Sequence, residues 1–233
     1  IHMGSCAEIL AKEQDYNRKE QDDFAKESYR RSIEAINKGY FQEEITSVEV
    51  PQKTGIPVII DTDEEPGRSK VGKISKLKPA FKEDGTITAA NASTINDGAA
   101  AVVVMSAKKS KKLNVKPICK IIAQTSFAQE PIYFTTAPGN AISVILNKCG
   151  LAINDIDLFE INEAFSNVTL SAMREHNIPH EEVTLNRKIC LLSDSILPSE
   201  KEQLTFVSLP SEQSNESETN KAITTHTFVH EVG

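Results

Sequence analysis

Residues 86–105 constrain the fold more than any other stretch, because they combine small, hydrogen-bonding and β-branched residues. The order of residue types predicts a short strand over 86–88 and a buried strand over 98–105. Between them, residues 89–97 carry side chains so small that backbone amides and carbonyls are the main polar groups present. The residues alone favour an interior crossing packed against another element. A close approach of the backbone to a ligand is the alternative.

Helix and strand patterns alternate along the chain, which predicts an α/β fold. Asn17 is the expected N-cap of a helix that ends at Gly39, with Glu20 as its capping-box partner. Pro138 and Gly150 bound another helix. We also expect helices over 4–14 and 164–176, strands over 45–50, 58–60, 119–128 and 157–161, an acidic loop over 61–66, and a buried helix face formed by Phe24, Ala25, Tyr29, Ile33 and Ile36.

Composition bounds the class of protein. The chain has 233 residues, of which 39% are hydrophobic and 25% charged, as in globular proteins of one or two domains. A net charge of −7 disfavours a nucleic-acid partner. The sequence contains no apolar run of membrane-spanning length, so we expect no membrane partner.

The cysteines and histidines do not predict a metal site. The four cysteines are widely spaced without a C-x-x-C pair, which fits a reducing compartment: Cys6, Cys119, Cys149 and Cys190. His176 and His180 are four residues apart, but Pro179 interrupts the helix between them. We expect two exposed loop histidines rather than a metal or catalytic pair.

A basic run occupies residues 68–78 of this acidic chain, with Arg68, Lys70, Lys73, Lys76 and Lys78. Arginine and lysine supply charge-assisted donors, so the run could bind a phosphorylated ligand. A solvated charged face is the alternative, and from the run alone it is favoured.

Three stretches, in order, resemble one family. Residues 88–105, TAANASTINDGAAAVVVM, resemble the Asn-Ala-Ser…Asn-Asp-Gly-Ala-Ala segment of thiolases, the acetyl-CoA C-acetyltransferases. Residues 1–32 resemble the start of the thiolase loop domain, and 159–167, FEINEAFSN, resemble the Asn-Glu-Ala-Phe motif. The sequence around these motifs is most similar to that of the mitochondrial acetoacetyl-CoA thiolases, and the resemblance covers about residues 1–183.

The resemblance implies an incomplete thiolase-like α/β fold. Its parts are the coenzyme A-binding loop domain (1–93), the end of the N-terminal half (94–116) and the start of the C-terminal half (117–183). Residues 184–233 are polar and aperiodic, and we expect them to be an unrelated, largely disordered tail. The resemblance also implies a mitochondrial location, although the chain shows no transit peptide and would otherwise be cytoplasmic. Family members form homo-oligomers.

The resemblance implies specific site residues. Asn162 matches the asparagine that holds a water of an oxyanion hole, although an asparagine there could also cap the next helix. Ser93 matches the serine that contacts the pantetheine arm, and Tyr29 is a further expected coenzyme A contact. Residues Arg68, Ser69, Lys70 and Lys73 match the nucleotide-contacting segment, while Tyr29, Ala89, Ala90 and Ala92 match part of a potassium site made largely of carbonyl oxygens.

Three hypotheses follow for function. The first is a thiolase that interconverts two acetyl-CoA with acetoacetyl-CoA and CoA, truncated at both ends and inactive as given. The nucleophilic cysteine, the Gly-His-Pro histidine and the C-terminal cysteine of the family have no counterpart among these residues. The second is a non-catalytic remnant that still binds CoA. The third is a folding-incompetent splice or gene-model product whose strands would lack neighbours.

Overall fold

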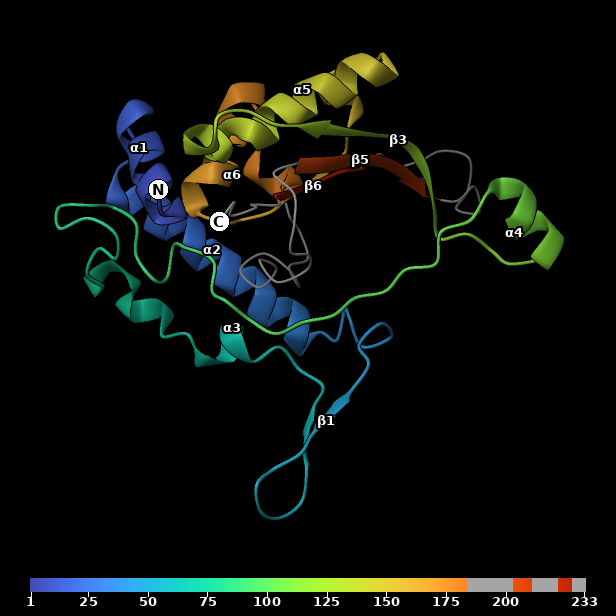
Figure 1. Cartoon of the computed structure of the whole chain (residues 1–233), viewed down its shortest axis with the longest axis horizontal. Helices are drawn as coiled ribbons and strands as arrows, with labels where there is room; N and C mark the ends of the chain where they lie inside the picture. The colour runs from blue at the N-terminus through green and yellow to red at the C-terminus, as the bar shows by residue number, and fades with distance from the viewer. Residues whose placement is uncertain (184–202, 211–221, 228–233) are drawn as a thin grey trace.

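A four-stranded sheet, in the order β3-β5-β6-β4, lies under helix α5 (Figure 1). In this computed structural model, the described residues are 1–183 together with the strands β5 (Gln203–Pro210) and β6 (Ala222–Thr227). β5 pairs antiparallel with both β3 (Cys119–Phe127) and β6, whereas β6 pairs parallel with β4 (Leu158–Ile161). The sequence predictions for β3 and β4 are therefore confirmed to within a residue.

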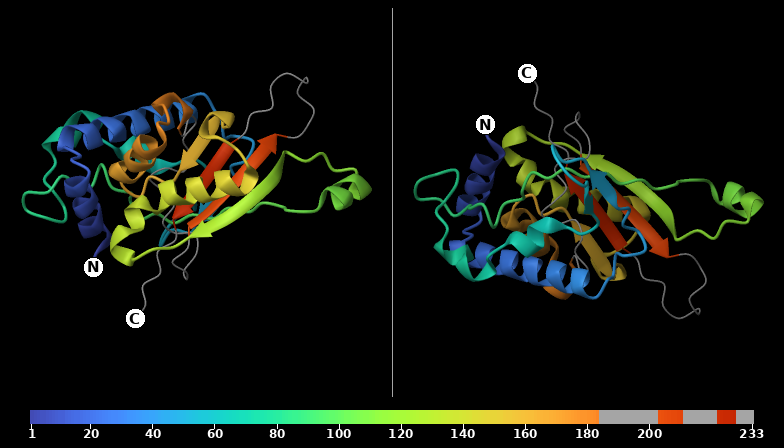
Figure 2. Two further views of the ribbon diagram at one scale, coloured as in Figure 1. Left: turned by 90° about the horizontal axis from the view of Figure 1, so that it is seen from above. Right: turned by 90° about the horizontal axis from the view of Figure 1, so that it is seen from below.

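Helix α5 (Ala137–Cys149) lies over β3, β5 and β6, as Figure 2 shows from above. It begins with proline in its first turn and ends at Gly150, whose φ of 65° is left-handed, as predicted. Its inner face forms the main core with β4 and the following helix α6 (Ser166–His176). The core residues are Ile142, Ile145, Leu146, Ile156, Phe159, Ile161, Ala172, Ile178 and Val183.

Helices α1 (Met3–Glu13) and α2 (Arg18–Asn37) contact α6 and lie on the side of the molecule away from α4 (Figure 1). The predicted capping box is present: the Glu20 amide donates to Asn17 Oδ1 at 3.0 Å, and the Asn17 amide donates to Glu20 Oε2 at 2.9 Å. Phe24 and Tyr29 are buried as expected, but Ile33 and Ile36 are only half-buried because α2 contacts other elements mainly along its first half.

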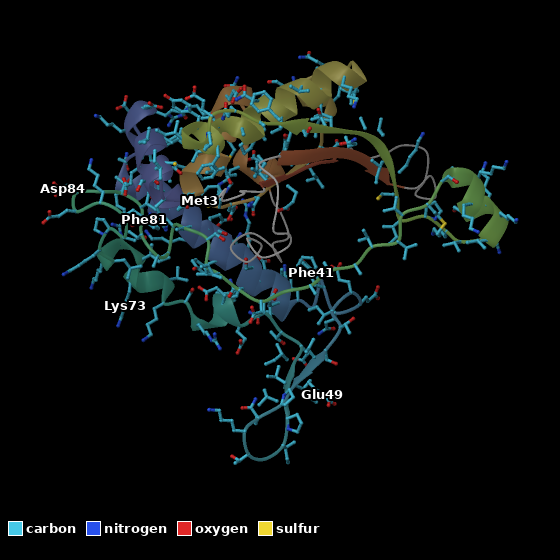
Figure 3. All side chains as sticks on the ribbon, in the orientation of Figure 1. Met3, Phe41, Glu49, Lys73, Phe81 and Asp84 are labelled. Carbon is cyan, nitrogen blue, oxygen red and sulfur yellow. The ribbon has the colours of Figure 1, made fainter. Side chains whose placement is uncertain are left out.

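Shorter elements complete the described residues. Strands β1 (Val48–Val50) and β2 (Val58–Ile60) form the predicted hairpin, which projects from the body and carries the labelled Glu49 (Figure 3). The segment 61–66 is not simply a loop, because helix α3 (Glu64–Arg68) begins within it with two glutamates at its electropositive end. The remaining elements are helix α4 (Ala107–Leu113) and the 3-10 helices η1 (Val71–Lys76), η2 (Pro131–Thr136), η3 (Ile153–Asp155) and η4 (His180–Glu182).

The prediction of two strands within 86–105 is wrong. Residues 86–88 form no strand, and residues 98–105 are without regular structure, with Val102 86% and Val103 87% exposed. An apolar run becomes a buried strand only where a neighbouring strand and a covering layer exist. Among the described residues, no strand pairs with this segment.

The expected disorder of 184–233 is wrong for β5 and β6. Residues 204–209 instead belong to β5, which joins β3 and β6 in the four-stranded sheet. The third hypothesis, that the strands would lack neighbours, is likewise wrong for β3 and β4. The other residues of the tail, including the apolar patch 189–192, lie outside the described ranges.

No helix in the described part of the chain combines the length and apolarity needed to cross a bilayer.

Candidate functional site

The crossing at residues 86–93 is held by hydrogen bonds from two helices. Glu8 of α1 accepts from the backbone amides of Thr86 at 2.9 Å and Ile87 at 2.8 Å. The fully buried Asn91 accepts from the Thr88 amide at 2.7 Å and donates to Asp22 of α2 at 3.0 Å. The buried backbone polar groups of this segment are thus paired with side chains that belong to other elements.

The Asn-Glu-Ala-Phe segment, residues 162–165, docks directly on this crossing. The Ser93 amide donates to the Ala164 carbonyl at 2.9 Å, and the Ser166 amide donates to the Asn91 carbonyl at 2.9 Å. Ala92 and Phe165 form an isolated antiparallel bridge between these two hydrogen bonds. Two motifs that are distant in sequence therefore share one short backbone ladder.

Asn162 follows the last residue of β4 and is 6% exposed. Its neighbour Glu163 is buried and accepts a hydrogen bond from Ser28 Oγ of α2 at 2.7 Å. The alternative that Asn162 caps the next helix is wrong, because the N-cap of α6 is Phe165. Asn162 thus lies between the end of β4 and the residues that pair with the crossing.

Tyr29 joins α2 to the crossing and to the basic segment. Its ring packs in one buried cluster with Ile74 of η1 and Ala90. Its hydroxyl donates to Glu65 Oε1 at 3.3 Å, and burial raises the pKa of Tyr29.

The alanines expected at a potassium site do not share one environment. Ala90 packs beside Tyr29, Ala92 packs in a separate cluster with Ala7 and Phe165, and Ala89 is exposed. The tyrosine hydroxyl and backbone carbonyls are hard oxygen donors of the kind that suit a potassium ion. No cluster of three or more His, Cys, Asp or Glu suited to a metal exists within the described residues.

The basic run divides into two parts. Arg68 is paired with Glu64 at 2.7 Å, and Ser69 donates to Glu65 Oε1 at 3.4 Å. Lys70 and Lys73 are exposed, and Figure 3 shows Lys73 at the outer edge of the molecule. Within the described ranges, neither lysine forms an ion pair closer than 4.0 Å, and the same holds for Lys76 and Lys78. The lysines therefore keep a positive field that an anionic ligand could use.

Cys6, His176 and His180 make structural contacts. Cys6 is buried with its sulfur 4.0 Å from the Pro131 carbonyl, and burial raises the pKa of its thiol, which opposes a nucleophilic role. The expectation of two exposed loop histidines is wrong. His176 ends α6 and contacts the Gly139 carbonyl at 2.8 Å, while His180 stacks on Phe24 at 5.1 Å. Cys190 lies outside the described residues.

Sequence analysis missed the residues that assemble the site. Glu8, Arg18 and Asp22 each bind a backbone or side chain of the crossing or of η1. The spacing of Arg18 and Asp22, four residues apart on a predicted helix, is a local signal that they pair. Nothing local to Glu8 indicates its partners, because these lie far along the chain.

Comparisons with known proteins agree with this arrangement. The family model "Thiolase, N-terminal domain" matches residues 1–108, and "Thiolase, C-terminal domain" matches residues 115–188. The chain is 46% identical over 187 residues to a mouse protein named mitochondrial acetyl-CoA acetyltransferase, and 47% identical to the human one. Each alignment covers 80% of this chain, which spans only 44% of the length of these relatives.

Solved structures give the same result. A thiolase of Ascaris suum, crystallised with coenzyme A, is 40% identical at a TM-score of 0.75 and covers 81% of this chain and 48% of its own. A Bacillus anthracis acetyl-CoA acetyltransferase is 34% identical at a TM-score of 0.78, covering 82% of this chain and 48% of its own. The partial α/β fold is thus the predicted thiolase-like fold, and the chain belongs to the thiolase family.

Proposed function

We propose that these residues form the coenzyme A-binding part of an acetyl-CoA acetyltransferase. The reaction is the condensation of two acetyl-CoA molecules to acetoacetyl-CoA and CoA, or the reverse thiolysis. The observation that carries the proposal is the meeting of three distant segments: the crossing pairs with residues 162–166 and packs against η1 through Tyr29 and Ile74. The Ascaris suum relative, whose crystals contain coenzyme A, supports the choice of ligand.

Each expected residue has a role suited to its position. Lys70 and Lys73 offer exposed ammonium groups to the phosphates of the nucleotide, and Arg68 and Ser69 flank them. Ser93 lies at the end of the crossing, where its side chain would contact the pantetheine arm. Asn162 would hold the water that stabilises negative charge on the thioester oxygen, because a preorganised donor stabilises charge that develops during reaction.

The polypeptide of residues 1–233, taken by itself, is proposed to bind CoA without turning it over. No cysteine here stands in a motif that matches the family's nucleophile, and no histidine stands in a Gly-His-Pro motif. Detectable cleavage of acetoacetyl-CoA by the purified polypeptide would contradict this part of the proposal. The second candidate function is CoA binding with no part in catalysis, favoured by Lys73 and Lys76 of η1, which form no ion pair within the described residues.

Four further properties are proposed from the relatives. A mitochondrial location is supported by the names of the mouse and human proteins. A homo-oligomeric state and a potassium ion held by Tyr29 and the carbonyls of Ala89, Ala90 and Ala92 are implied by the family. The division into 1–93, 94–116 and 117–183, with an unrelated tail after it, is also proposed; the two family models match 1–108 and 115–188, which supports only the boundary near residue 116.

Titration calorimetry with CoA tests the proposal. Lys73→Ala is expected to weaken binding about fivefold, the effect of roughly 1 kcal/mol for one exposed charge near a phosphate. Lys112→Ala is the matched control, because it removes the same charge from exposed α4, which lies far from η1 (Figure 1). The absence of heat at millimolar CoA, or equal effects of both changes, would refute a CoA site at η1.

A further inference from the structure

Arg18 lies at the first position of α2 and reaches across to the basic segment. Its Nη2 atom donates to the carbonyls of Ile74 and Leu77, each at 3.0 Å. These carbonyls end the 3-10 helix that carries Lys73. A cation is favourable there, because the carbonyls at the end of a helix carry partial negative charge.

The other edge of the same guanidinium binds Asp22. Arg18 Nε donates to Asp22 Oδ2 at 2.8 Å, and Asp22 is 2% exposed. The second carboxylate oxygen accepts from Asn91 Nδ2 at 3.0 Å, and Asn91 in turn binds the backbone of Thr86 and Thr88. A continuous chain of hydrogen bonds thus runs from η1 through α2 into the crossing.

Two independent contacts fix η1 beside the crossing. Ile74 is buried against Tyr29 and Ala90 through its side chain, and its carbonyl is bound by Arg18. The Arg18 backbone is itself fixed, because it lies within the Asn17–Glu20 capping box. A planar guanidinium holds its donors on separate nitrogens in a fixed fork, so Nε can bind the carboxylate while Nη2 binds the two carbonyls; the three donors of an ammonium all lie on one nitrogen.

We propose that Arg18 and Asp22 are positioning residues that set the distance between the lysines of η1 and the crossing that carries Ser93. They touch no ligand and act through the backbone of η1 and through Asn91. This inference rests on the proposed coenzyme A function. It predicts that loss of the guanidinium fork lowers affinity for the nucleotide end of CoA and leaves affinity for the pantetheine end unchanged.

The test compares Arg18→Lys with Lys19→Ala in the full chain. Arg18→Lys keeps the charge and removes the fork, whereas Lys19 is an exposed neighbour that pairs only with Asp23 among the described residues. Calorimetry is run with CoA and with pantetheine, which lacks the nucleotide. We expect Arg18→Lys to weaken CoA binding roughly tenfold, as for loss of hydrogen bonds made by a charged group. Pantetheine binding by Arg18→Lys, and both ligands with Lys19→Ala, should stay within about twofold.

Amide hydrogen exchange separates this inference from the proposed function. Exchange over residues 71–77 should be faster in Arg18→Lys than in Lys19→Ala, whether or not CoA binds. Unchanged exchange, unchanged CoA affinity, or equal weakening of both ligands would overturn the positioning role. If the unchanged chain binds no CoA and exchange is still faster in Arg18→Lys, the proposed function is refuted. The inference that Arg18 holds η1 in position is then retained.

Discussion

Glu8→Ala tests the physical basis of the crossing most directly. The Glu8 carboxylate accepts the Thr86 amide at 2.9 Å and the Ile87 amide at 2.8 Å, and Ile87 is fully buried. Removing the carboxylate leaves a buried amide without its acceptor, which costs more than the net value of the bond itself. Hydrogen bonds to a charged group contribute ~1.5–3 kcal/mol each. We take the low end for two such bonds, a loss of about 3 kcal/mol, because water can replace the lost acceptor at the half-buried Thr86.

The measurement is urea unfolding followed by far-UV circular dichroism. With a slope of about 2 kcal/mol per molar urea, a loss of about 3 kcal/mol lowers the midpoint by roughly 1.5 M. Glu13→Ala on the exposed side of the same helix is the matched control and should stay within about 0.5 kcal/mol of the unchanged chain. Gly85→Ala disturbs the same hydrogen bonds in a second way, because an added Cβ would collide with the Glu8 carboxylate. Equal midpoints for Glu8→Ala and Glu13→Ala would refute the argument.

Three other changes probe separate features. Hydrogen bonds from Arg30 and then Arg31 hold the pKa of Glu27 at about 2, below its ordinary 4.5, so the stabilisation is complete above pH 4.5 and is lost as pH falls toward 2. The stability difference between the unchanged chain and Glu27→Gln, about 1 kcal/mol after allowing for solvent screening, should therefore vanish by pH 2 in urea titrations. Gly150→Ala should lower stability by about 1 kcal/mol in thermal melts, because the left-handed backbone opposes it; among the described residues, no atom beyond the two chain neighbours lies within 4 Å of the added Cβ. Val103→Asp should change urea stability by less than about 0.5 kcal/mol, since Val103 is 87% exposed, and a larger loss would show that its segment is buried in solution.

Local features of the fold were predictable because their partners are near in sequence. The capping box of Asn17 and Glu20 spans three residues, and the Gly150 end of α5 needs only one left-handed residue. Residues 98–105 were mispredicted because composition specifies an apolar strand but not the presence of a neighbour. β5 was missed for the converse reason, since a weak apolar patch becomes a strand once β3 offers it an edge.

The candidate site shows the same division. The motif residues Tyr29, Lys73 and Asn162 were identified individually, but their spatial relation depends on contacts between α2, η1 and the crossing. The bonds of Arg18 connect segments that no sequence spacing relates. The sequence therefore predicts which residues form the candidate site but not the tertiary contacts that orient their side chains.

The small residues of the crossing reconcile the two interpretations that the sequence left open. Ala90 packs against Tyr29 on one side, and Ala92 packs in a separate apolar cluster. A larger side chain at either position would force these layers apart, because buried layers are packed without spare volume. Packing thus accounts for the alanines whose side chains are buried. Ala89 remains exposed and Ser93 half-buried, so these are the positions where backbone and hydroxyl groups can face a ligand. One segment can therefore be a tight interior crossing over most of its length and still present Ala89 and Ser93 to the proposed coenzyme A ligand.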